Sequence, residues 1–398
     1  MKAFLILEDG TVFEGTHIGA NREIISEIVF NTSMAGYLEV LTDPSYAGQA
    51  VCMTYPLIGN YGICKDDMES RRPWPDGFIV RELSRVSSNF RCDCTIQQFL
   101  EENDVPGIAG IDTRALTKIL REKGTMNGMI TTDENFDFAQ IQPRLKAYTT
   151  GKVVEKVTCR EKYVVKPTTD LAQNGALSGS ARFDKAAFES GVRESRPTLV
   201  KELNGAGLRV ALMDFGAKDN IAHSLAERGC EVTVYPALTS AEEIIQSHPD
   251  GIMLSNGPGD PKECTSIIEE IKKLYATDIP IFAICLGHQL MALATGADTH
   301  KMKYGHRGGN HPVKDLKTGR VYISSQNHGY VVDTDKLDPK IAVPAFVNVN
   351  DGTNEGLAYT GKNIFTVQYH PEACPGPQDS RYLFDRFISM MKGENYNA

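Results

Sequence analysis

The segment of residues 279–296 constrains the possible folds more than any other part of the sequence. Ile279–Ile284 is apolar without alternation, which is typical of a strand that is covered on both faces of a sheet. Cys285 follows directly, and leucines then recur at helical spacing until Gly296, a residue that favours a helix end. A buried strand that turns at once into a helix predicts an α/β fold.

The C-terminal half repeats this alternation of strands and helices. The pattern predicts strands at Leu208–Met213, Glu231–Tyr235, Ile252–Ser255, Arg320–Ser324 and Ile364–Val367, and helices at Asp219–Arg228 and Ser266–Tyr275, with a short helix opened by Ser240-x-x-Glu243. The βαβα order predicts a doubly wound, mostly parallel sheet with helices on both sides. Ligands of such sheets bind at the C-terminal ends of the strands.

The N-terminal part has a different pattern and predicts a mixed β/α domain. Predicted strands are Lys2–Leu7, Thr11–Glu14, Glu27–Asn31 and Gln49–Tyr55, and predicted helices are Cys94–Asn103 and Asp112–Lys123. We expect an N-terminal domain over residues 1–150, a connector over 151–206 and a C-terminal domain over 207–394. Asp170–Pro197 has few large apolar residues, so it predicts either a loosely packed connector or a short helical subdomain.

Composition narrows the class of protein. Hydrophobic residues make up 41% of the 398 residues, and the net charge is −9 without a basic stripe, so we expect a globular protein with no nucleic-acid partner. The sequence has no apolar run of bilayer length and no secretory signal pattern, so we expect no membrane contact and a cytoplasmic location. Nine cysteines predict no disulfide framework, and Cys92-x-Cys94 lacks the partners of a zinc site, so we expect no metal.

Cys285 is the candidate nucleophile. It lies between small residues, Ala283 and Gly287, at a sharp strand-to-helix turn that has the pattern of a nucleophile elbow. N–H groups at a helix start favour the thiolate and can stabilise an oxyanion. The alternative is a buried cysteine that fills a core gap. The order of strand, small residue, cysteine, small residue and helix favours the nucleophile.

His370 is the candidate base. Gln368-Tyr369-His370-Pro371-Glu372 follows a predicted strand, so His370 lies at the same edge as Cys285 if the two strands share a sheet. A histidine beside a thiol can take its proton and later protonate a leaving amine, and Glu372 is near enough to orient the imidazole. A lone histidine would usually be structural, but the pairing with a cysteine favours catalysis.

Two further segments have the composition of binding loops. Ser255–Pro261 combines glycines with prolines, so its backbone can approach a ligand closely. Gln326–Tyr330 follows the predicted strand Arg320–Ser324 and offers donors and acceptors suited to an α-amino acid head group. Plain turns are the alternative for each segment.

These motifs resemble the class I (triad) glutamine amidotransferase family: NGPGDP at 256–261, ICLGHQ at 284–289, NHG at 327–329 and HPE at 370–372. Further segments resemble the small-subunit family of glutamine-hydrolysing carbamoyl-phosphate synthases: residues 30–49, 54–62, 110–117, 305–313 and 370–387. This likeness covers nearly the whole chain apart from the connector.

The resemblance implies a role for each motif residue. It implies that Cys285 forms a γ-glutamyl thioester, that His370 is base and acid, and that Glu372 orients it. It implies an oxyanion hole at the N–H groups of Gly257 and Leu286. Further implied glutamine contacts are Gly259, Gln289, Asn327, Gly329, Tyr330 and, from the N-terminal domain, Ser45.

The same resemblance implies a partner. Ammonia would pass through a tunnel to a large subunit, which would hold ATP and Mg²⁺ and make carbamoyl phosphate from bicarbonate and two ATP, for arginine or pyrimidine synthesis or both. This chain has no P-loop and would bind no cofactor itself. It departs from the family pattern at Ala283, usually Gly, and at Cys374, usually Ser or Ala, and its connector is longer than usual.

Three rival functions follow from the same motifs. A glutaminase that serves another synthetase would carry a different second domain. An inactive scaffold would not need the three triad residues. A free-standing cysteine hydrolase would have no large ATP-binding partner. The N-terminal motifs and the intact triad favour the carbamoyl-phosphate synthase family.

Overall fold

The computed structural model describes residues 1–167, 192–194, 204–373 and 375–394. It contains two compact units, one of Met1–Val153 with Met302–Gly309 and one of Val154–Lys301 with Asn310–Ala398. Most of the predicted connector over 151–206, and also Cys374, lie outside the described residues. The described part of the connector contains the helix α5 (Val154–Val157) and the strands β10 (Tyr163–Lys166) and β11 (Val192–Glu194). No helix within the described ranges is both long enough and apolar enough to span a bilayer.

The first unit is built on a closed barrel with strand order β1-β2-β8-β6-β4-β3-β9. These strands are β1 (Lys2–Leu7), β2 (Val12–Gly19), β3 (Ile24–Asn31), β4 (Gln49–Met53), β6 (Gly77–Val80), β8 (Pro106–Ala109) and β9 (Met126–Thr131). Along β4, Ala50 and Cys52 pack in one core cluster while Val51 and Met53 pack in another, because successive side chains point to opposite faces. The sequence predicted the mixed β/α composition but not the closure.

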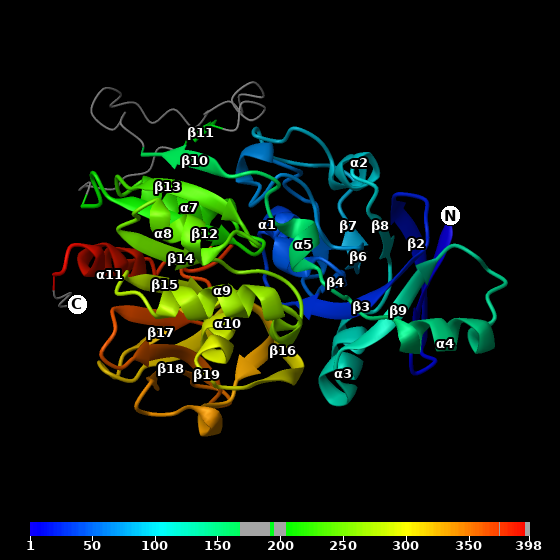
Figure 1. Ribbon diagram of the computed structural model, residues 1–398. Coiled ribbons are helices and arrows are strands. Elements are labelled where there is room, and N and C mark those ends of the chain that lie inside the picture. Colours follow the sequence, from blue (N-terminus) through cyan, green and yellow to red (C-terminus); the bar gives the residue numbers. More distant parts are fainter. Residues whose placement is uncertain (168–191, 195–203, 374, 395–398) are drawn as a thin grey trace. The chain divides into compact units, whose positions relative to one another are not determined.

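Short helices surround this barrel (Figure 1). They are α1 (Tyr37–Thr42), α2 (Ile96–Glu102), α3 (Thr113–Lys123) and α4 (Phe138–Ala147). Helix α3 begins at Asp112, whose side chain accepts a hydrogen bond from the Ala115 N–H, and ends at Gly124, as predicted. A minor pair, β5 (Leu57–Ile58) and β7 (Glu82–Leu83), completes the unit.

The second unit is built on an 11-stranded sheet with the order β11-β10-β13-β12-β14-β15-β20-β19-β18-β16-β17. Its strands are β10 (Tyr163–Lys166), β12 (Arg209–Asp214), β13 (Glu231–Pro236), β14 (Gly251–Leu254), β15 (Ile281–Ile284), β16 (Thr299–Asp315), β17 (Val321–Val332), β18 (Ala342–Asn348), β19 (Asn354–Tyr359) and β20 (Ile364–Val367). The centre, from β13 to β20, is parallel, and β10 and β19 pair antiparallel with its two sides.

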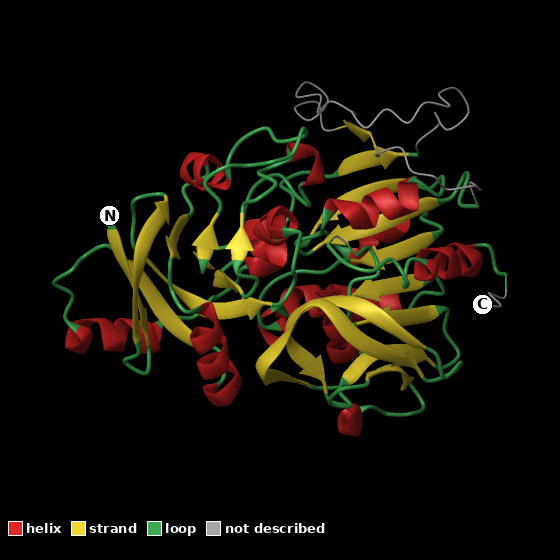
Figure 2. Cartoon of the chain, turned by 180° about the vertical axis from the view of Figure 1, so that it is seen from behind, coloured by secondary structure: helices red, strands yellow, loops and turns green. Residues whose placement is uncertain are grey.

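Helices cover both faces of this sheet (Figure 2). They are α5 (Val154–Val157), α7 (Asp219–Ala226), α8 (Ala241–Gln246), α9 (Thr265–Tyr275), α10 (Leu286–Ala294) and α11 (Tyr382–Met391). Ala211 of β12 packs in a cluster with residues of α8, α9 and α10, whereas its neighbour Val210 packs with residues of α7 and α11. The doubly wound α/β fold predicted from the sequence is therefore confirmed.

One prediction about this sheet is wrong. Gln326–Tyr330 was expected to follow a short strand, Arg320–Ser324, but it lies inside the long strand β17 (Val321–Val332). A run of polar residues with a glycine is typical of a turn. Here Gln326 and His328 are buried within a strand because their side chains find hydrogen-bond partners inside the unit.

Candidate active site

Cys285 occupies a strained turn between β15 and α10. Its backbone has φ 52° and ψ −104°, in the left-handed half of the map, where a residue other than glycine is uncommon. Its N–H donates to the Val367 carbonyl at 2.8 Å, which ties the turn to the end of β20. The side chain is buried, and a Cβ at Gly287 would lie 2.5 Å from the Leu254 carbonyl oxygen. Glycine is therefore required for the helix to start this close to β14.

The sheet brings the candidate nucleophile and the candidate base to one edge. β15 and β20 are parallel neighbours, and Ile284 lies opposite Val367 in the register. The C-terminal ends of the two strands therefore lie side by side, as predicted from their sequence pattern. The His370 N–H donates to the Ser325 carbonyl of β17 at 2.9 Å, which holds the segment after β20.

The His370 ring is oriented by Glu372. Nδ1 of the ring lies 2.7 Å from Oε1 of the Glu372 carboxylate, so Nε2 is the ring atom left for proton transfer. Among the described residues, Nε2 has no hydrogen-bond partner. The Cys285 thiol donates instead to the Asn327 carbonyl, with Sγ 3.7 Å from the oxygen. The arrangement thus keeps a thiol and an imidazole nitrogen available to each other in a buried site.

Lys218 is a further charged group of the site that the sequence reasoning missed. Its Nζ lies 2.9 Å from the same Oε1 of Glu372, and the side chains of Lys218 and Glu372 are 4% and 0% exposed. Lysine is almost never buried without a partner. Its position shortly after β12 could have identified it as a candidate site residue, because β12 ends at the same sheet edge as β15.

The buried charges shift the pKa values in opposite directions. Burial favours the neutral ring of His370, but the charge of Glu372, together with the interactions of the ring with Cys285 and Glu372, outweighs burial and raises the pKa of His370 to about 10. Burial likewise favours the neutral form of Glu372, but Lys218 and then His370 lower the pKa of its carboxyl to about 2. At neutral pH the site therefore holds an ionised carboxylate beside an imidazolium.

The loop that carries Lys218 is held by a buried carboxyl group. Asp214 accepts hydrogen bonds from the backbone N–H groups of Gly216 and Ala217 at 2.9 and 2.7 Å. The Lys218 N–H donates to the Asn256 side chain at 3.1 Å, which joins this loop to the segment after β14. Both loops at this sheet edge therefore fix each other.

Gly257 and Leu286, whose N–H groups are the candidate oxyanion donors, are neighbours in the second unit. A Cβ at Gly257 would lie 2.8 Å from Cδ2 of Leu286 and 2.2 Å from the Phe215 carbonyl oxygen, so only glycine fits there. Leu286 is the first residue of α10, directly after the nucleophile. Gly259 follows in the same loop as Gly257, with φ 94°.

The candidate glutamine contacts also lie in the second unit, with one exception. Nε2 of Gln289 donates to the Tyr330 carbonyl at 2.9 Å, and Asn327 and Gly329 lie on the same strand, β17. Ser45 belongs to the first unit, where it is buried in a short turn and its N–H donates to Asp43 at 2.9 Å. A role for Ser45 in glutamine binding stays a prediction.

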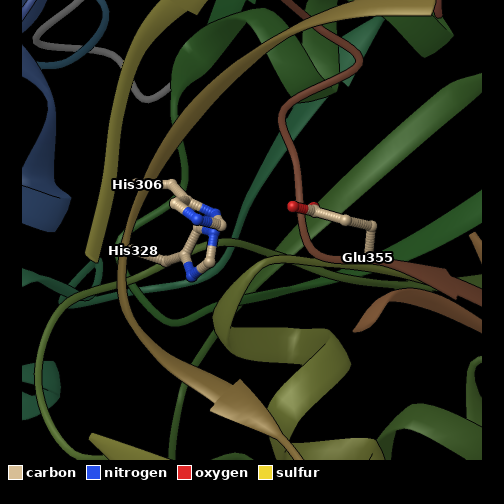
Figure 3. Close-up of side chains that lie close together, drawn as sticks. All are labelled: His306, His328 and Glu355. Carbon is tan, nitrogen blue, oxygen red and sulfur yellow. The ribbon is translucent and has the colours of Figure 1, made fainter. Parts of the chain in front are cut away.

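The second unit also contains a buried pair of metal-ligating types, His328 and Glu355 (Figure 3). A ring nitrogen of His328 and a carboxylate oxygen of Glu355 lie within 4.8 Å of each other. The side-chain amide of Gln326 forms hydrogen bonds with both residues and so bridges the pair. His306, also drawn, belongs to the first unit.

Comparison with known proteins gives two family matches. The model of glutamine amidotransferase class I matches residues 211–390, and the model of the carbamoyl-phosphate synthase small chain, CPSase domain, matches residues 5–130. The carbamoyl phosphate synthase small chain of Clostridium perfringens is 48% identical over 388 residues, which cover 98% of this chain and 99% of the relative.

Two other relatives agree. The small chain of Oceanobacillus iheyensis is 46% identical over 98% of this chain and 96% of its own length. That of Listeria monocytogenes is 47% identical over 99% of this chain and 98% of its own length.

Proposed function

The chain belongs to the family of carbamoyl phosphate synthase small chains, and we propose that Cys285, His370 and Glu372 perform the glutamine hydrolysis of this glutamine amidotransferase. Proposed substrate contacts are Ser45, Gly257, Gly259, Leu286, Gln289, Asn327, Gly329 and Tyr330. The domains proposed for this work are residues 1–150 and 207–394, joined by a connector over 151–206.

The reaction starts from the state in which the proton of the Cys285 thiol already lies on Nε2 of His370, so that a thiolate faces the imidazolium. The sulfur attacks the side-chain amide carbonyl of glutamine, and the N–H groups of Gly257 and Leu286 stabilise the oxyanion. His370 then protonates the leaving nitrogen, so that ammonia departs and a γ-glutamyl thioester remains on sulfur. Water, deprotonated by His370, hydrolyses the thioester to glutamate and restores the thiol. Glu372 holds Nδ1 throughout, and Lys218 balances its charge.

The ammonia serves a second protein. We propose a large subunit that receives it through an internal tunnel and combines it with bicarbonate and two ATP into carbamoyl phosphate. ATP and Mg²⁺ belong to that subunit, and this chain needs no cofactor because thiol and imidazole supply the chemistry. The complex works in the cytoplasm, in arginine or pyrimidine synthesis or both.

The observation that carries this proposal is the contact of His370 Nδ1 with Glu372, which leaves Nε2 for the buried thiol. The experiment is Cys285→Ser in the complex with the large subunit. Oxygen at this position is a far weaker nucleophile at neutral pH, so glutamine-dependent synthesis should fall by at least about a thousandfold.

The control is ammonia supplied directly to the same mutant preparation, with the wild-type complex alongside. Ammonia-dependent synthesis should persist because the substitution changes one atom at a turn. Glutamine-dependent synthesis at the wild-type rate would refute the assignment of Cys285 as the nucleophile.

A further inference from the structure

Glu355 is buried beside the candidate glutamine strand, and the reaction does not use it directly. It lies on β19 with 0% exposure. Its Oε1 accepts a hydrogen bond from Nε2 of Gln326 at 2.9 Å and another from Nδ2 of Asn348 at 2.8 Å. A carboxyl oxygen that receives two amide donors in a buried site fixes the direction of both amides.

The amide of Gln326 passes this orientation on. Its Nε2 also contacts Ser324 Oγ at 3.2 Å, so its Oε1 is turned to His328, whose Nε2 lies 3.0 Å away. The other ring nitrogen, Nδ1, lies 2.9 Å from the Tyr330 carbonyl oxygen. Figure 3 shows the His328 ring and the Glu355 carboxyl group on facing segments of the unit. The relay therefore runs from Glu355 through Gln326 and His328 to the backbone of Tyr330.

A second set of hydrogen bonds returns from Tyr330 to Glu355. Nε2 of Gln289, on the helix that follows the nucleophile, donates to the Tyr330 carbonyl and to Oε1 of Gln368, each at 2.9 Å. The Gln368 N–H, two residues before the base, donates to the Glu355 carbonyl at 2.9 Å. The hydrogen bonds thus form a closed ring through α10, β17, β19 and the segment that carries His370.

The ring holds the part of β17 that faces the nucleophile. Asn327, whose carbonyl accepts from the Cys285 thiol, lies between Gln326 and His328, which are both ring members. We infer that Glu355 is a positioning residue for glutamine binding, which acts through Gln326 and His328 to fix the Asn327–Tyr330 backbone against Cys285. The inference rests on the proposed glutamine contacts of Asn327, Gly329 and Tyr330.

The physical reason is the direction of the Gln326 amide. Without an acceptor at position 355, the buried NH₂ group of Gln326 loses one of its hydrogen-bond partners. Rotation of the amide then becomes favourable. Both ring nitrogens of His328 face acceptor oxygens, Gln326 Oε1 and the Tyr330 carbonyl, so both can donate only when the ring carries two protons. Rotation turns NH₂ toward the Nε2–H of that ring, so the ring must lose this proton or shift from its position beside Tyr330. The substrate contacts on β17 shift, while the triad, which is held by Lys218 and by the Ser325 carbonyl, remains in place. The expected consequence is a change in KM for glutamine rather than in kcat.

The test compares Glu355→Leu with Glu355→Gln in the complex with the large subunit. Leucine removes the acceptor, so KM for glutamine should rise by about tenfold or more, the scale of a lost buried hydrogen bond, with kcat within about threefold of wild type. The Glu355→Gln variant keeps an acceptor oxygen on a side chain of the same length, so it should retain most of the affinity for the substrate glutamine. Tyr359→Phe, at a buried position on the same strand outside the ring, is the matched control.

A second variant, Gln326→Met, removes the middle of the relay while Glu355 keeps Asn348, and it should raise KM similarly. Ammonia-dependent synthesis, measured on every variant, should stay at the wild-type rate. A wild-type KM in Glu355→Leu, equal impairment in Glu355→Gln, or unfolding of both Glu355→Leu and Gln326→Met would overturn the inference. If the wild-type complex itself fails to hydrolyse glutamine, the proposed function fails instead, so the two failures are distinguishable.

Discussion

At the scale of single residues, the site depends on one carboxylate that serves two cations. Oε1 of Glu372 contacts both Nδ1 of His370 and Nζ of Lys218. Burial of an unpaired carboxylate would be very unfavourable. Lys218 and the protonated His370 ring each stabilise the negative charge of Glu372, and that charge in turn stabilises both cations. Lys218 lowers the pKa of the Glu372 carboxyl, and Glu372 raises the pKa of the His370 ring.

Glu372→Gln should therefore lower the pKa of His370. With the carboxylate charge gone, burial and the positive charge of Lys218 both favour the neutral ring, so its proton should be lost well below pH 10, the approximate value in the wild type. The measurement is an NMR titration of ring-labelled histidine, with His370→Asn used to assign the resonance. A midpoint as high as in the wild type would show that Glu372 does not set the charge of the ring.

Ser45→Ala tests the implied contact from the first unit. If the Ser45 side chain binds glutamine, its loss should raise KM by about fivefold, as for one neutral hydrogen bond worth about 1 kcal/mol, and leave kcat nearly unchanged. Steady-state glutaminase kinetics of the complex give both constants. Wild-type values for both would show that Ser45 only packs in its turn.

At the scale of elements, the sequence predicted the parts that follow from hydrophobic pattern. β15, the elbow at Cys285 and β20 were recognisable because apolar runs end at residues with chemical side chains. The interior of β17 was not recognisable as a strand because its buried residues are polar. Their hydrogen bonds depend on Glu355, which is distant in the sequence. Lys218 was not recognised as a site residue for the same reason, because only the fold shows that it contacts Glu372.

The start of α10 provides a prediction at this scale. A methyl group at Gly287 would meet the Leu254 carbonyl oxygen at 2.5 Å, so Gly287→Ala should push the helix from β14. We expect a stability loss of about 1–3 kcal/mol, typical of overpacking, with a fall in kcat because Cys285 moves with the helix. Denaturant unfolding and glutaminase kinetics measure the two effects.

The matched control is Gly296→Ala, just past the other end of the same helix. There a methyl group meets nothing within 4 Å, although φ is +92°. That variant should lose stability through backbone strain but keep kcat. Equal kcat losses in the two variants would contradict a special role for the close approach at Gly287.

At the scale of the whole molecule, the chain combines two kinds of architecture. The triad and nearly all candidate glutamine contacts lie in the unit with the 11-stranded sheet, whereas the barrel unit provides only Ser45 among them. The thioester chemistry itself does not require the barrel unit, which comprises Met1–Val153 and Met302–Gly309. The barrel unit contains residues 5–130, which match the carbamoyl-phosphate synthase small chain, CPSase domain, so we assign this unit to the synthetase complex of that family.

The last prediction follows from that assignment. The isolated chain should hydrolyse glutamine slowly, and the rate should rise when the large subunit is present with ATP and bicarbonate, because a partner that binds the active arrangement preferentially shifts the population toward it. The resting contact of the Cys285 thiol with the Asn327 carbonyl gives such a shift a physical target. The measurement is the steady-state glutaminase rate of the chain alone, with the partner, and with the partner during ATP turnover. Cys285→Ser under the same conditions gives the background. Equal rates in all three states would contradict the prediction, since the site would then be fully organised without its partner.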